Sequence, residues 1–492
     1  MLSPTRFQFI GEVAELKTAK DWNSAALPKL WLYNLHYFDD LRAMECSARS
    51  SWHRDLIGRW IAENPPLAGN GWEPYPVSLR VANWIAWALA GNELDVAMRD
   101  SLAAQARVLD ATLEFHLRGN HLLANAKALV FAGCYFSGPE AEAWLRTGLD
   151  LLHAEWREQI LDDGAHFELS PMYHAVILED VLDLVQLSRI FPAQLAAVAE
   201  SRAWRTLALR MLEWLAGMSH ADGEISFFND AAFGISRTYG ELAAYAVLLG
   251  IAPKAKPDPS CRFASSGYVR LVQGPFQVIF DMAEIGPSYL PGHGHADVLS
   301  LEVSFAGRRL VTNGGTSSYA NGAVREEERS TAAHATVEID GQNSSEVWAS
   351  FRVGRRARPF DVTVAETPEG QSAAASHDGY RWLSGKPVHR REVILSPSGL
   401  RIHDRITGEG THTVIGRFPL HPAVSEIERE SNGWRLRLQE SRILRVVFDD
   451  SVDSFLSEGY YAPTFGQRIL RPVLAWRHNG ALPLSAETRF EF

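Results

Sequence analysis

Between about residues 77 and 250, apolar side chains recur at the spacing of an α-helix. The pattern is clearest in VSLRVANWIAWALA (77–90), ANAKALVFAGCYF (124–136), AVILEDVLDLVQLSRI (175–190) and AWRTLALRMLEWLAGM (203–218). Turn-forming residues separate these segments at 91–94, 137–141, 162–171 and 219–230. The alternation predicts long amphipathic helices in serial hairpins, which we expect to curve into an incomplete (α/α) toroid.

The pattern changes at PKAKPDPSCR (253–262), a segment rich in proline and charge. After it, short runs alternate with a period of two residues, as in SGYVRLVQ, FQVIFDMA, LSLEVSFAGRRLVTNG, ATVEIDG, REVILSPSGLRIHDRIT, THTVIGRFPL, GWRLRLQ and RILRVVFD. Such runs are typical of antiparallel strands with one buried face. We therefore predict a multi-domain α + β protein, with the toroid and an N-terminal extension over 1–255 and a C-terminal antiparallel β-sandwich over 256–492.

Length and composition agree with two large globular domains. A chain of 492 residues is too long for one ordinary core. Its 46% hydrophobic and 22% charged residues exclude disordered and collagen-like chains. The formal net charge of −11 argues against non-specific nucleic-acid binding, which needs an excess of Lys and Arg. A polyanionic substrate would therefore require a locally basic cleft.

Cysteine usage and the N-terminal segment bear on the cellular compartment. Cys46, Cys134 and Cys261 are odd in number and lack CxxC spacing, so they indicate neither a disulfide framework nor a thiolate zinc site. The N-terminal residues lack the basic and apolar regions of a signal peptide, and no apolar run of about 18 residues occurs. We expect no membrane span and a cytoplasmic location, with the periplasm as the alternative.

The first candidate for chemistry is HLRGNHLLANAKAL (116–129), in which Asn120 and His121 follow Gly119 at the start of a helical run. An amide and an imidazole beside the free N–H groups of a helix N-terminus can bind a carboxylate. An Asn cap with an incidental His explains this segment equally well.

The second candidate is FELSPMYH (167–174), a polar loop before an apolar helix. Pro171 fits the first position of that helix, so Tyr173 should lie in its first turn, near the loops. A packing role is the alternative, because most tyrosines are amphipathic packing residues.

The third candidate is PGHGHADVLSLEV (291–303), in which two histidines stand two residues apart before a strand. In an extended loop this spacing places His293 and His295 on the same side, as a metal pair or as a base beside a ligand. A solvated turn is the alternative. Later segments add Asn313, Tyr319 and His334, so that His295 and His334 could share a zinc ion with Asn313 or Asp297 as third ligand.

Taken together, these segments resemble the heparinase II/III-like polysaccharide lyases, which pair an (α/α) toroid with a β-sandwich. The resemblance covers nearly the whole chain. It is carried by WLYNLHYFDD (31–40), WEPYPVSLRVANWI (72–85), RGNHLLANAKAL, ELSPMYH, GHGHADVLSLEV and AAHATVEIDGQ, in this order along the predicted domains.

The resemblance implies a role for individual positions. Asn120 and His121 would hold and neutralise the carboxylate of a uronic acid. Tyr173 and His293 are similar to the catalytic tyrosine and histidine of the family. His295, Asn313 and His334 would hold a structural metal ion such as zinc, which relatives bind through two histidines and an aspartate. Asn313 departs from that pattern, and a neutral amide is a weaker zinc ligand than a carboxylate.

The implied reaction is β-elimination in an acidic polysaccharide or oligosaccharide. Abstraction of the C5 proton pushes charge onto the uronate carboxyl group, so that group must first be neutralised. Tyr173 and His293 would share the roles of base and acid, with the assignment left open. A tyrosine base, whose reference pKa is about 10, needs nearby positive charge. Arg80, Arg118 and Lys127 are candidate sources.

Substrate binding is expected in a cleft between the two predicted domains, because Asn120 and Tyr173 fall in the helices and His293 in the sandwich. We expect Trp72, Glu73, Arg80, Arg118 and Tyr319 to contact substrate. Packing explains Trp72 and Glu73 at least as well.

Two other classes of function remain. A glycoside hydrolase on a similar toroid would use two carboxylates, such as Glu168 and Asp230, as acid and base. A non-catalytic or biosynthesis-associated protein that binds acidic polysaccharides would account for the departure at Asn313. The sequence leaves open the uronate polymer, endo or exo action, metal occupancy and the oligomeric state.

Overall fold

The computed structural model describes residues 1–195, 200–254, 259–367, 370–424, 426–431, 433–438 and 442–492. They form two compact units: unit 1 contains Met1–Ile160 and Asp180–Arg205, and unit 2 contains Leu161–Glu179 and Thr206–Phe492. This division differs from the expected one at residue 255. Parts of the predicted helical region pack with the strands, so each unit is described below by itself.

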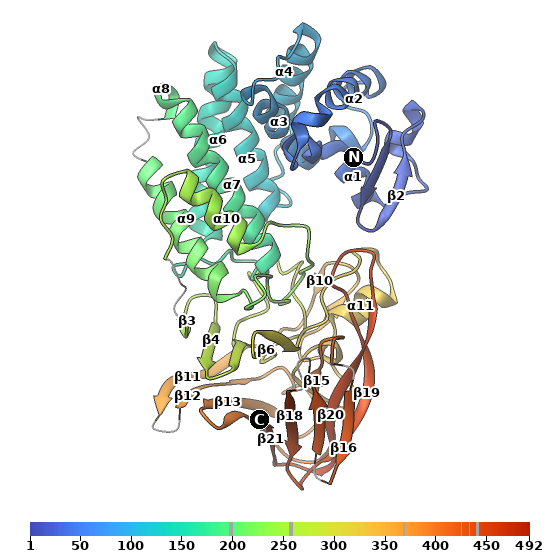
Figure 1. Ribbon diagram of the computed structural model, residues 1–492, viewed down its shortest axis with the longest axis vertical. Coiled ribbons are helices and arrows are strands. Elements are labelled where there is room, and N and C mark those ends of the chain that lie inside the picture. Colours follow the sequence, from blue (N-terminus) through green and yellow to red (C-terminus); the bar gives the residue numbers. More distant parts are fainter. Residues whose placement is uncertain (196–199, 255–258, 368–369, 425, 432, 439–441) are drawn as a thin grey trace. The chain divides into compact units, whose positions relative to one another are not determined.

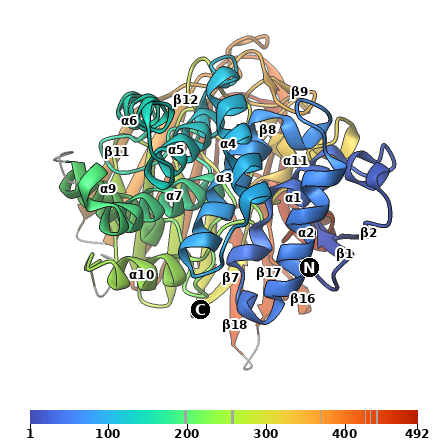
Figure 2. The same ribbon diagram turned by 90° about the horizontal axis from the view of Figure 1, so that it is seen from above.

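Unit 1 is built mainly from helices. It begins with a β-hairpin of β1 (Arg6–Phe9) and β2 (Glu12–Glu15), followed by α1 (Lys29–Tyr37), α2 (Ser50–Glu63), α3 (Pro74–Leu89), α4 (Val96–Ala111), α5 (Gly119–Tyr135) and α6 (Pro139–Gln159), with α8 (Pro192–Leu195) later in the chain. Helices α3 to α6 lie side by side in both ribbon views (Figures 1 and 2). Helix α5 is buried along nearly its whole length, and it carries apolar residues on all its faces, as a buried helix does.

Local sequence explains where these helices begin. Proline stands at the start of α3 and α6, where its missing N–H costs nothing. Pro139 therefore begins a helix within the segment 137–141 that we expected to be a turn. The Asp95 carboxylate caps α4 by accepting a hydrogen bond from the N–H of Met98 at 2.8 Å.

Two long helices contribute residues to both units. These are α7 (Pro171–Ile190) and α9 (Glu200–Gly217), and α10 (Tyr239–Leu248) lies wholly in unit 2. In unit 2, Trp214 and Met218 share a buried apolar cluster with Phe263, Tyr268 and Ile279. Burial of this cluster explains why the residues around the end of α9 belong to the same compact unit as the first strands.

Three antiparallel sheets make up most of unit 2. One has the order β3 (Cys261–Phe263), β4 (Tyr268–Gln273), β5 (Phe276–Asp281), β6 (Leu301–Phe305), β7 (Arg308–Val311). The largest has the order β11 (Pro359–Thr367), β12 (Gly370–His377), β13 (Val388–Ser396), β14 (Gly399–Thr407), β21 (Leu484–Glu491), β18 (Ile443–Phe448), β17 (Gly433–Arg437), β16 (Glu426–Glu430). The third has the order β19 (Asp453–Tyr461), β20 (Ile469–Ala481), β15 (Thr411–Pro419), β8 (Val337–Ile339).

One hydrophobic core joins the three sheets. It includes Phe280 of β5, Ile402 of β14, Trp476 of β20 and Phe490 of β21, all fully buried. Inward-facing side chains from different sheets therefore pack as in a sandwich. The predicted fold class, helices followed by an antiparallel β-sandwich, is confirmed.

Some strands escaped the sequence prediction for identifiable reasons. Strand β12 has the sequence GQSAAASH, whose small residues have little β propensity. Strand β20 contains Pro472, which lies opposite Glu458 in the register, and proline argues against a strand interior. No helix in the described part of the chain has the length and apolarity to cross a membrane.

A series of buried hydrogen bonds in the sandwich pairs two imidazoles so that each ring nitrogen has a hydrogen-bond partner. The N–H of Gly379 donates to Nδ1 of His377 at 3.1 Å, so Nε2 of His377 can donate to Nδ1 of His389 at 3.2 Å. Nε2 of His389 then donates to Asp404 at 2.7 Å, and Arg391 binds both oxygens of that carboxylate. Each ring accepts at Nδ1 and donates at Nε2, so both imidazoles make these hydrogen bonds in their neutral form.

His174 makes the stability of unit 2 dependent on pH. Its Nδ1 accepts from the N–H of His166 at 3.1 Å and its Nε2 donates to the carbonyl of Met211 at 2.9 Å, so a second proton would remove an acceptor. Burial lowers the pKa of His174 to about 4. The unfolded chain, with a pKa near 6.5, binds this proton first. The resulting stability is complete above pH 6.5 and is lost as the pH falls toward 4.

We therefore expect this group to lower the free energy of unfolding by about 2 kcal/mol between pH 7 and pH 5. Urea denaturation at both pH values measures the effect. The variant His174→Gln, which cannot titrate, should show a smaller difference by that amount. An equal pH dependence in both proteins would contradict the assignment.

Candidate active site

Tyr173 lies in the first turn of α7, as the position of Pro171 predicts. The hydroxyl of Ser170 accepts a hydrogen bond from the N–H of Tyr173 at 3.2 Å and donates one to the carbonyl of Asp230. The start of α7 is thereby attached to the loop that follows α9. This part of α7 belongs to unit 2, together with His293.

The two residues predicted to be catalytic stack on each other. The ring centroids of Tyr173 and His293 lie 4.1 Å apart with an angle of 33° between the planes. The phenolic oxygens of Tyr173 and Tyr319 lie 2.9 Å apart, although 146 residues separate them in sequence. Burial and the nearby charge of Asp230 raise the pKa of Tyr319 well above its ordinary value. Tyr319 therefore stays protonated and can donate its hydrogen bond to the oxygen of Tyr173.

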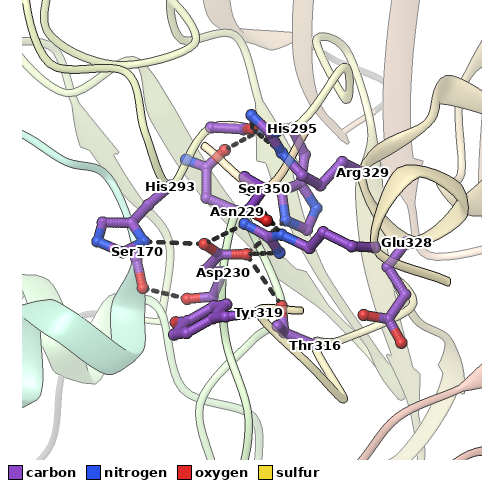
Figure 3. A network of polar contacts seen from close by, with 12 residues as sticks. Ser170, Asn229, Asp230, His293, His295, Thr316, Tyr319, Glu328, Arg329 and Ser350 are labelled. Atoms are coloured by element: carbon purple, nitrogen blue, oxygen red, sulfur yellow. Dashed lines mark hydrogen bonds and ion pairs between the residues drawn. The ribbon is translucent and has the colours of Figure 1, made fainter. Parts of the chain in front are cut away.

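Asp230 is the centre of a buried polar network (Figure 3). One carboxylate oxygen, Oδ2, accepts from Nδ1 of His293 at 2.8 Å and from Arg325 at 2.7 Å. The other, Oδ1, accepts from Nε2 of His295 at 2.9 Å, from the hydroxyl of Thr316 at 3.2 Å, and from Arg325. Burial alone would raise the pKa of Asp230, but the charge of Arg325 and the hydrogen bonds hold it well below its ordinary value.

The ionised Asp230 fixes the proton on His293. A carboxylate only accepts hydrogen bonds, so Nδ1 of His293 must carry the proton in this contact. In the neutral imidazole, Nε2 is then a proton acceptor. The His293 side chain is 16% exposed, whereas Asp230 is fully buried. The pair therefore has the arrangement of an orienting carboxylate and a general base or acid.

The same loops are joined through their backbones. Oδ1 of Asn229 accepts from the N–H of His295 at 3.0 Å, and its amide donates to the carbonyl of Leu169 at 3.0 Å. The N–H of Asp230 donates to the carbonyl of His293 at 3.1 Å. Asn229 has a φ of 56°, a left-handed conformation that Asn tolerates better than most residues. The catalytic candidates are thus held by interlocked loops on rigid elements.

The predicted metal residues include a pair of imidazoles with facing acceptors. Nδ1 of His295 lies 3.1 Å from Nε2 of His334. The other nitrogen of His295 donates to Asp230, and that of His334 donates to the carbonyl of Ser330 at 2.7 Å. Burial lowers the pKa of His295 to about 4 and that of His334 well below its ordinary value, so both rings are neutral. Unlike the pair His377 and His389, they direct two lone pairs at each other.

This geometry suits two ligands of one zinc ion. Nitrogens bound to zinc at about 2.05 Å and tetrahedral angles lie about 3.3 Å apart. Asn313 is fully buried in the same unit, and its Oδ1 accepts a long hydrogen bond of 3.4 Å from the N–H of Ala335. Among the residues that the structure describes, no group of three or more His, Cys, Asp or Glu side chains is arranged to hold a metal. The predicted donor set of two imidazoles and the Asn313 amide stays a prediction.

Asn120 and His121 lie at the start of α5 in unit 1. Asn120 is buried, and His121 is half-buried with Nδ1 3.0 Å from a carboxylate oxygen of Glu114. The His121 ring lies 4.3 Å from the ring of Tyr75. Arg118, which precedes the helix, is exposed and has a φ of 56°. Binding of a uronate carboxylate by these residues, in a cleft between the predicted domains, stays a prediction.

Two residues expected to contact substrate are buried and make internal hydrogen bonds. Arg80 is fully buried in unit 1, where it stacks 3.9 Å from the Trp60 ring and donates to the carbonyl of Gly71 at 2.7 Å and to Gln105 at 2.7 Å. Trp72 is 7% exposed, and its indole N–H donates to a backbone carbonyl. Packing and internal hydrogen bonds occupy both side chains, and their contact with substrate stays a prediction.

Other charged candidates are held in ion pairs. Lys127 is buried between Asp180 and Asp183, with an Nζ–oxygen distance of 2.6 Å to the second carboxylate. It therefore does not supply free positive charge to Tyr173. Glu73 pairs with Lys29 at 2.9 Å and accepts a hydrogen bond from Tyr33, but remains partly exposed.

Sequence reasoning missed the residues that organise the site. The sequence points to Asp230 only as one carboxylate of the hydrolase alternative, and it gives no indication of Arg325. Both are fully buried, which is unusual for charged residues unless they are paired. No local spacing pointed to them, because their partners are 63 and 95 residues away along the chain.

Comparison with known proteins matches both predicted regions of the chain to one family. The description "Heparinase II/III N-terminus" matches residues 60–245, and "Heparinase II/III-like, C-terminal" matches residues 255–475. The chain belongs to the heparinase II/III-like family. Among solved structures, heparinase III aligns with a TM-score of 0.77 at 19% identity, over 96% of this chain and 79% of that one. This heparinase II/III-like protein therefore shares the toroid and sandwich fold.

Alignments with curated relatives cover smaller parts of both proteins. The heparin-sulfate lyase of Bacteroides stercoris is 24% identical over 52% of this chain and 40% of that protein. FtsZ-localized protein C of Caulobacter vibrioides is 27% identical over 78% of this chain and 67% of that protein. The match to this heparinase II/III-like chain thus covers less than half the length of the Bacteroides stercoris lyase.

Proposed function

We propose that this protein is a polysaccharide lyase that cleaves a uronic-acid-containing polysaccharide or oligosaccharide by β-elimination. The observation that carries the proposal is the assembly of Tyr173, His293 and Tyr319 around the buried Asp230. The names of relatives such as the heparin-sulfate lyase of Bacteroides stercoris support it. The net charge of −11 disfavours non-specific binding of any polyanion, so an acidic saccharide requires a locally basic surface.

The proposed reaction uses two proton-transfer groups. One removes the C5 proton of the uronate while the other protonates O4 of the leaving sugar, and the electron pair from C5 forms the C4–C5 double bond. Tyr173 has a protonated phenol at 2.9 Å to stabilise its phenolate. In its neutral form His293 has an unprotonated Nε2, and a carboxylate stabilises its imidazolium. Asn120 and His121 would neutralise the uronate carboxyl group.

The hydrolase alternative fits the structure poorly. It needs two carboxylates that flank the scissile bond. Asp230 is fully buried and is bound by Arg325, His293 and His295, so it has no access to a sugar. Glu168 is 3% exposed and lies 3.8 Å from Nδ1 of His166.

Elimination and hydrolysis give different products, which provides the test. Purified protein is incubated with heparan sulfate, hyaluronan, alginate and bacterial exopolysaccharides, and ultraviolet absorbance and reducing ends are followed together. We expect absorbance to rise with reducing ends on at least one polymer. Reducing ends without absorbance would establish hydrolysis instead. The absence of both signals on all polymers would favour the non-catalytic binding protein.

We further propose that His295, His334 and Asn313 hold one zinc ion. When bound, zinc would supply a structural charge that satisfies the two facing lone pairs and fixes the loop carrying His293. We expect about one zinc per chain by elemental analysis, lost in His295→Ala and in His334→Ala. Asn313→Asp, which restores a carboxylate ligand, should raise zinc affinity at least about tenfold. The site would be contradicted if the protein as purified contained no zinc and its melting temperature did not respond to added zinc, in wild type and Asn313→Asp alike.

A further inference from the structure

Residues 347–358, VWASFRVGRRAR, form a positively charged strip in an acidic protein. They contain four arginines and no acidic residue, in a chain with a net charge of −11. Arg352, Arg355 and Arg358 are exposed. In the described part of the chain, none of these three guanidinium groups forms an ion pair with a carboxylate. Uncompensated arginines of this kind are suited to bind carboxylate or sulfate groups.

Exposed aromatic side chains accompany this basic strip. Trp348 is 52% exposed and Phe351 is 44% exposed. Large aromatic side chains in solvent commonly mark a binding surface when they cluster beside polar groups. Flat aromatic faces pack well against the apolar faces of sugar rings. Arginines and aromatic side chains together suit an anionic polysaccharide ligand.

The basic strip lies beside the catalytic candidates at Phe351. The ring of Phe351 lies 5.9 Å from that of His293 and 5.3 Å from that of Tyr319. From there the chain continues through Arg352 and the short strand β10 (Arg352–Val353) to Arg355, whose guanidinium stacks 4.1 Å from the Trp382 ring. The arginines of the strip therefore follow, along the chain, a residue that lies beside the catalytic candidates.

Two buried arginines fix the basic strip to the catalytic loop. Arg329 donates to the carbonyl of Gly294, between His293 and His295, at 2.9 Å. It also donates to the carbonyl of Ala349 at 3.1 Å and that of Arg352 at 3.2 Å. Arg325, which binds Asp230, donates to the carbonyl of Ser350 at 3.0 Å. The hairpin of β9 (Val347–Trp348) and β10 is thus oriented before substrate binds.

We infer that the basic strip 347–358 is a substrate-binding subsite for the acidic polysaccharide, in which Trp348 packs on a sugar ring and Arg352 and Arg355 bind its carboxylate or sulfate groups. This inference rests on the proposed lyase function. A nucleic acid would match the charge alone, but contact between Phe351 and His293 ties the subsite to the catalytic pair. The locally basic surface that an acidic substrate requires therefore lies within unit 2.

The test compares two double variants that remove the same charge. Arg352→Ala/Arg355→Ala changes the strip, and Arg437→Ala/Arg445→Ala removes two arginines that are 52% and 57% exposed on β17 and β18. For a polymer that wild type cleaves, we expect the strip variant to raise KM about tenfold with a smaller change in kcat, and the control to leave both unchanged. Trp348→Ala should raise KM by about fivefold.

A binding measurement keeps the inference separate from catalysis. Elution from immobilised heparin by increasing salt is measured for the same proteins, and we expect the strip variant to elute at lower salt than the control. If wild type cleaves no polymer, the lyase proposal fails while this measurement still decides the role of the basic strip. Equal elution of the two variants would overturn the inference. Equal weakening on immobilised DNA and heparin, with KM unchanged, would overturn its assignment to a polysaccharide.

Discussion

Replacement of Tyr173 by phenylalanine is expected to lower kcat/KM about a thousandfold on the polymer that the protein cleaves. A positioned general acid or base contributes about 10²–10⁴ to the rate. The variant keeps the ring that stacks 4.1 Å from His293 and removes only the oxygen that contacts Tyr319. The fold should therefore be preserved, and the loss should fall on kcat more than on KM. Initial rates of ultraviolet absorbance measure it.

Tyr319→Phe is the matched control for this prediction. It removes the partner hydroxyl but leaves the oxygen of Tyr173 in place, so the loss should be about 10- to 100-fold, the value of one hydrogen bond to a charged group. Tyr460→Phe, at a tyrosine that is 42% exposed on β19, should have no effect. If Tyr173→Phe retains activity within tenfold of wild type, the phenol does not transfer a proton in the rate-limiting step.

Asp230→Asn should impair both stability and catalysis, because this carboxylate has two roles. Each carboxylate oxygen accepts from Arg325 and from one imidazole, so an amide nitrogen at either position would face both donors. The proton on His293 or His295 must then move to the other ring nitrogen. A wrong tautomer at a general base lowers rates by about 10³ or more. The buried charge of Arg325 also loses its partner, which costs about 3–5 kcal/mol of unfolding free energy.

The two effects are separated by measuring activity per folded molecule. Thermal unfolding followed by circular dichroism gives the stability loss, and kcat is measured well below the melting temperature. Asp222→Asn is the control, because Asp222 also binds an arginine, Arg309, through both oxygens but is 38% exposed and lies outside the network of Asp230. It should leave kcat unchanged. An Asp230→Asn protein that folds and keeps kcat within tenfold would show that Asp230 does not orient His293.

The network explains how residues far apart in sequence act as one site. Tyr173 comes from the first turn of α7, Asp230 from the loop after α9, His293 from the loop between β5 and β6, and Arg325 from α11 (Ala323–Arg329). Each element is stabilised by its own packing, and a single buried carboxylate sets the protonation of two imidazoles. The basic strip, which is joined to the same network through Arg325 and Arg329, adds a surface for substrate to a centre that is otherwise buried.

Periodicity in the sequence determined the classes of structure and the local positions of several candidates. The helical spacing of apolar residues before residue 250 and the two-residue alternation after it reflect one buried face per element, which is a local property of the chain. Pro171 placed Tyr173 in a first helical turn for the same reason. Spacing also placed His293 and His295 together in one loop.

Only the tertiary structure decided which of these residues act together. Arg80 and Asp230 both look like available charges in the sequence, yet Arg80 is enclosed by Trp60 and backbone carbonyls, and Asp230 is enclosed by its donors. Hydrogen bonds that span 63 to 146 residues depend on how loops from different elements meet, and no local pattern encodes that. Burial then fixes the protonation of these groups, because a charge without water must be matched by a neighbouring one.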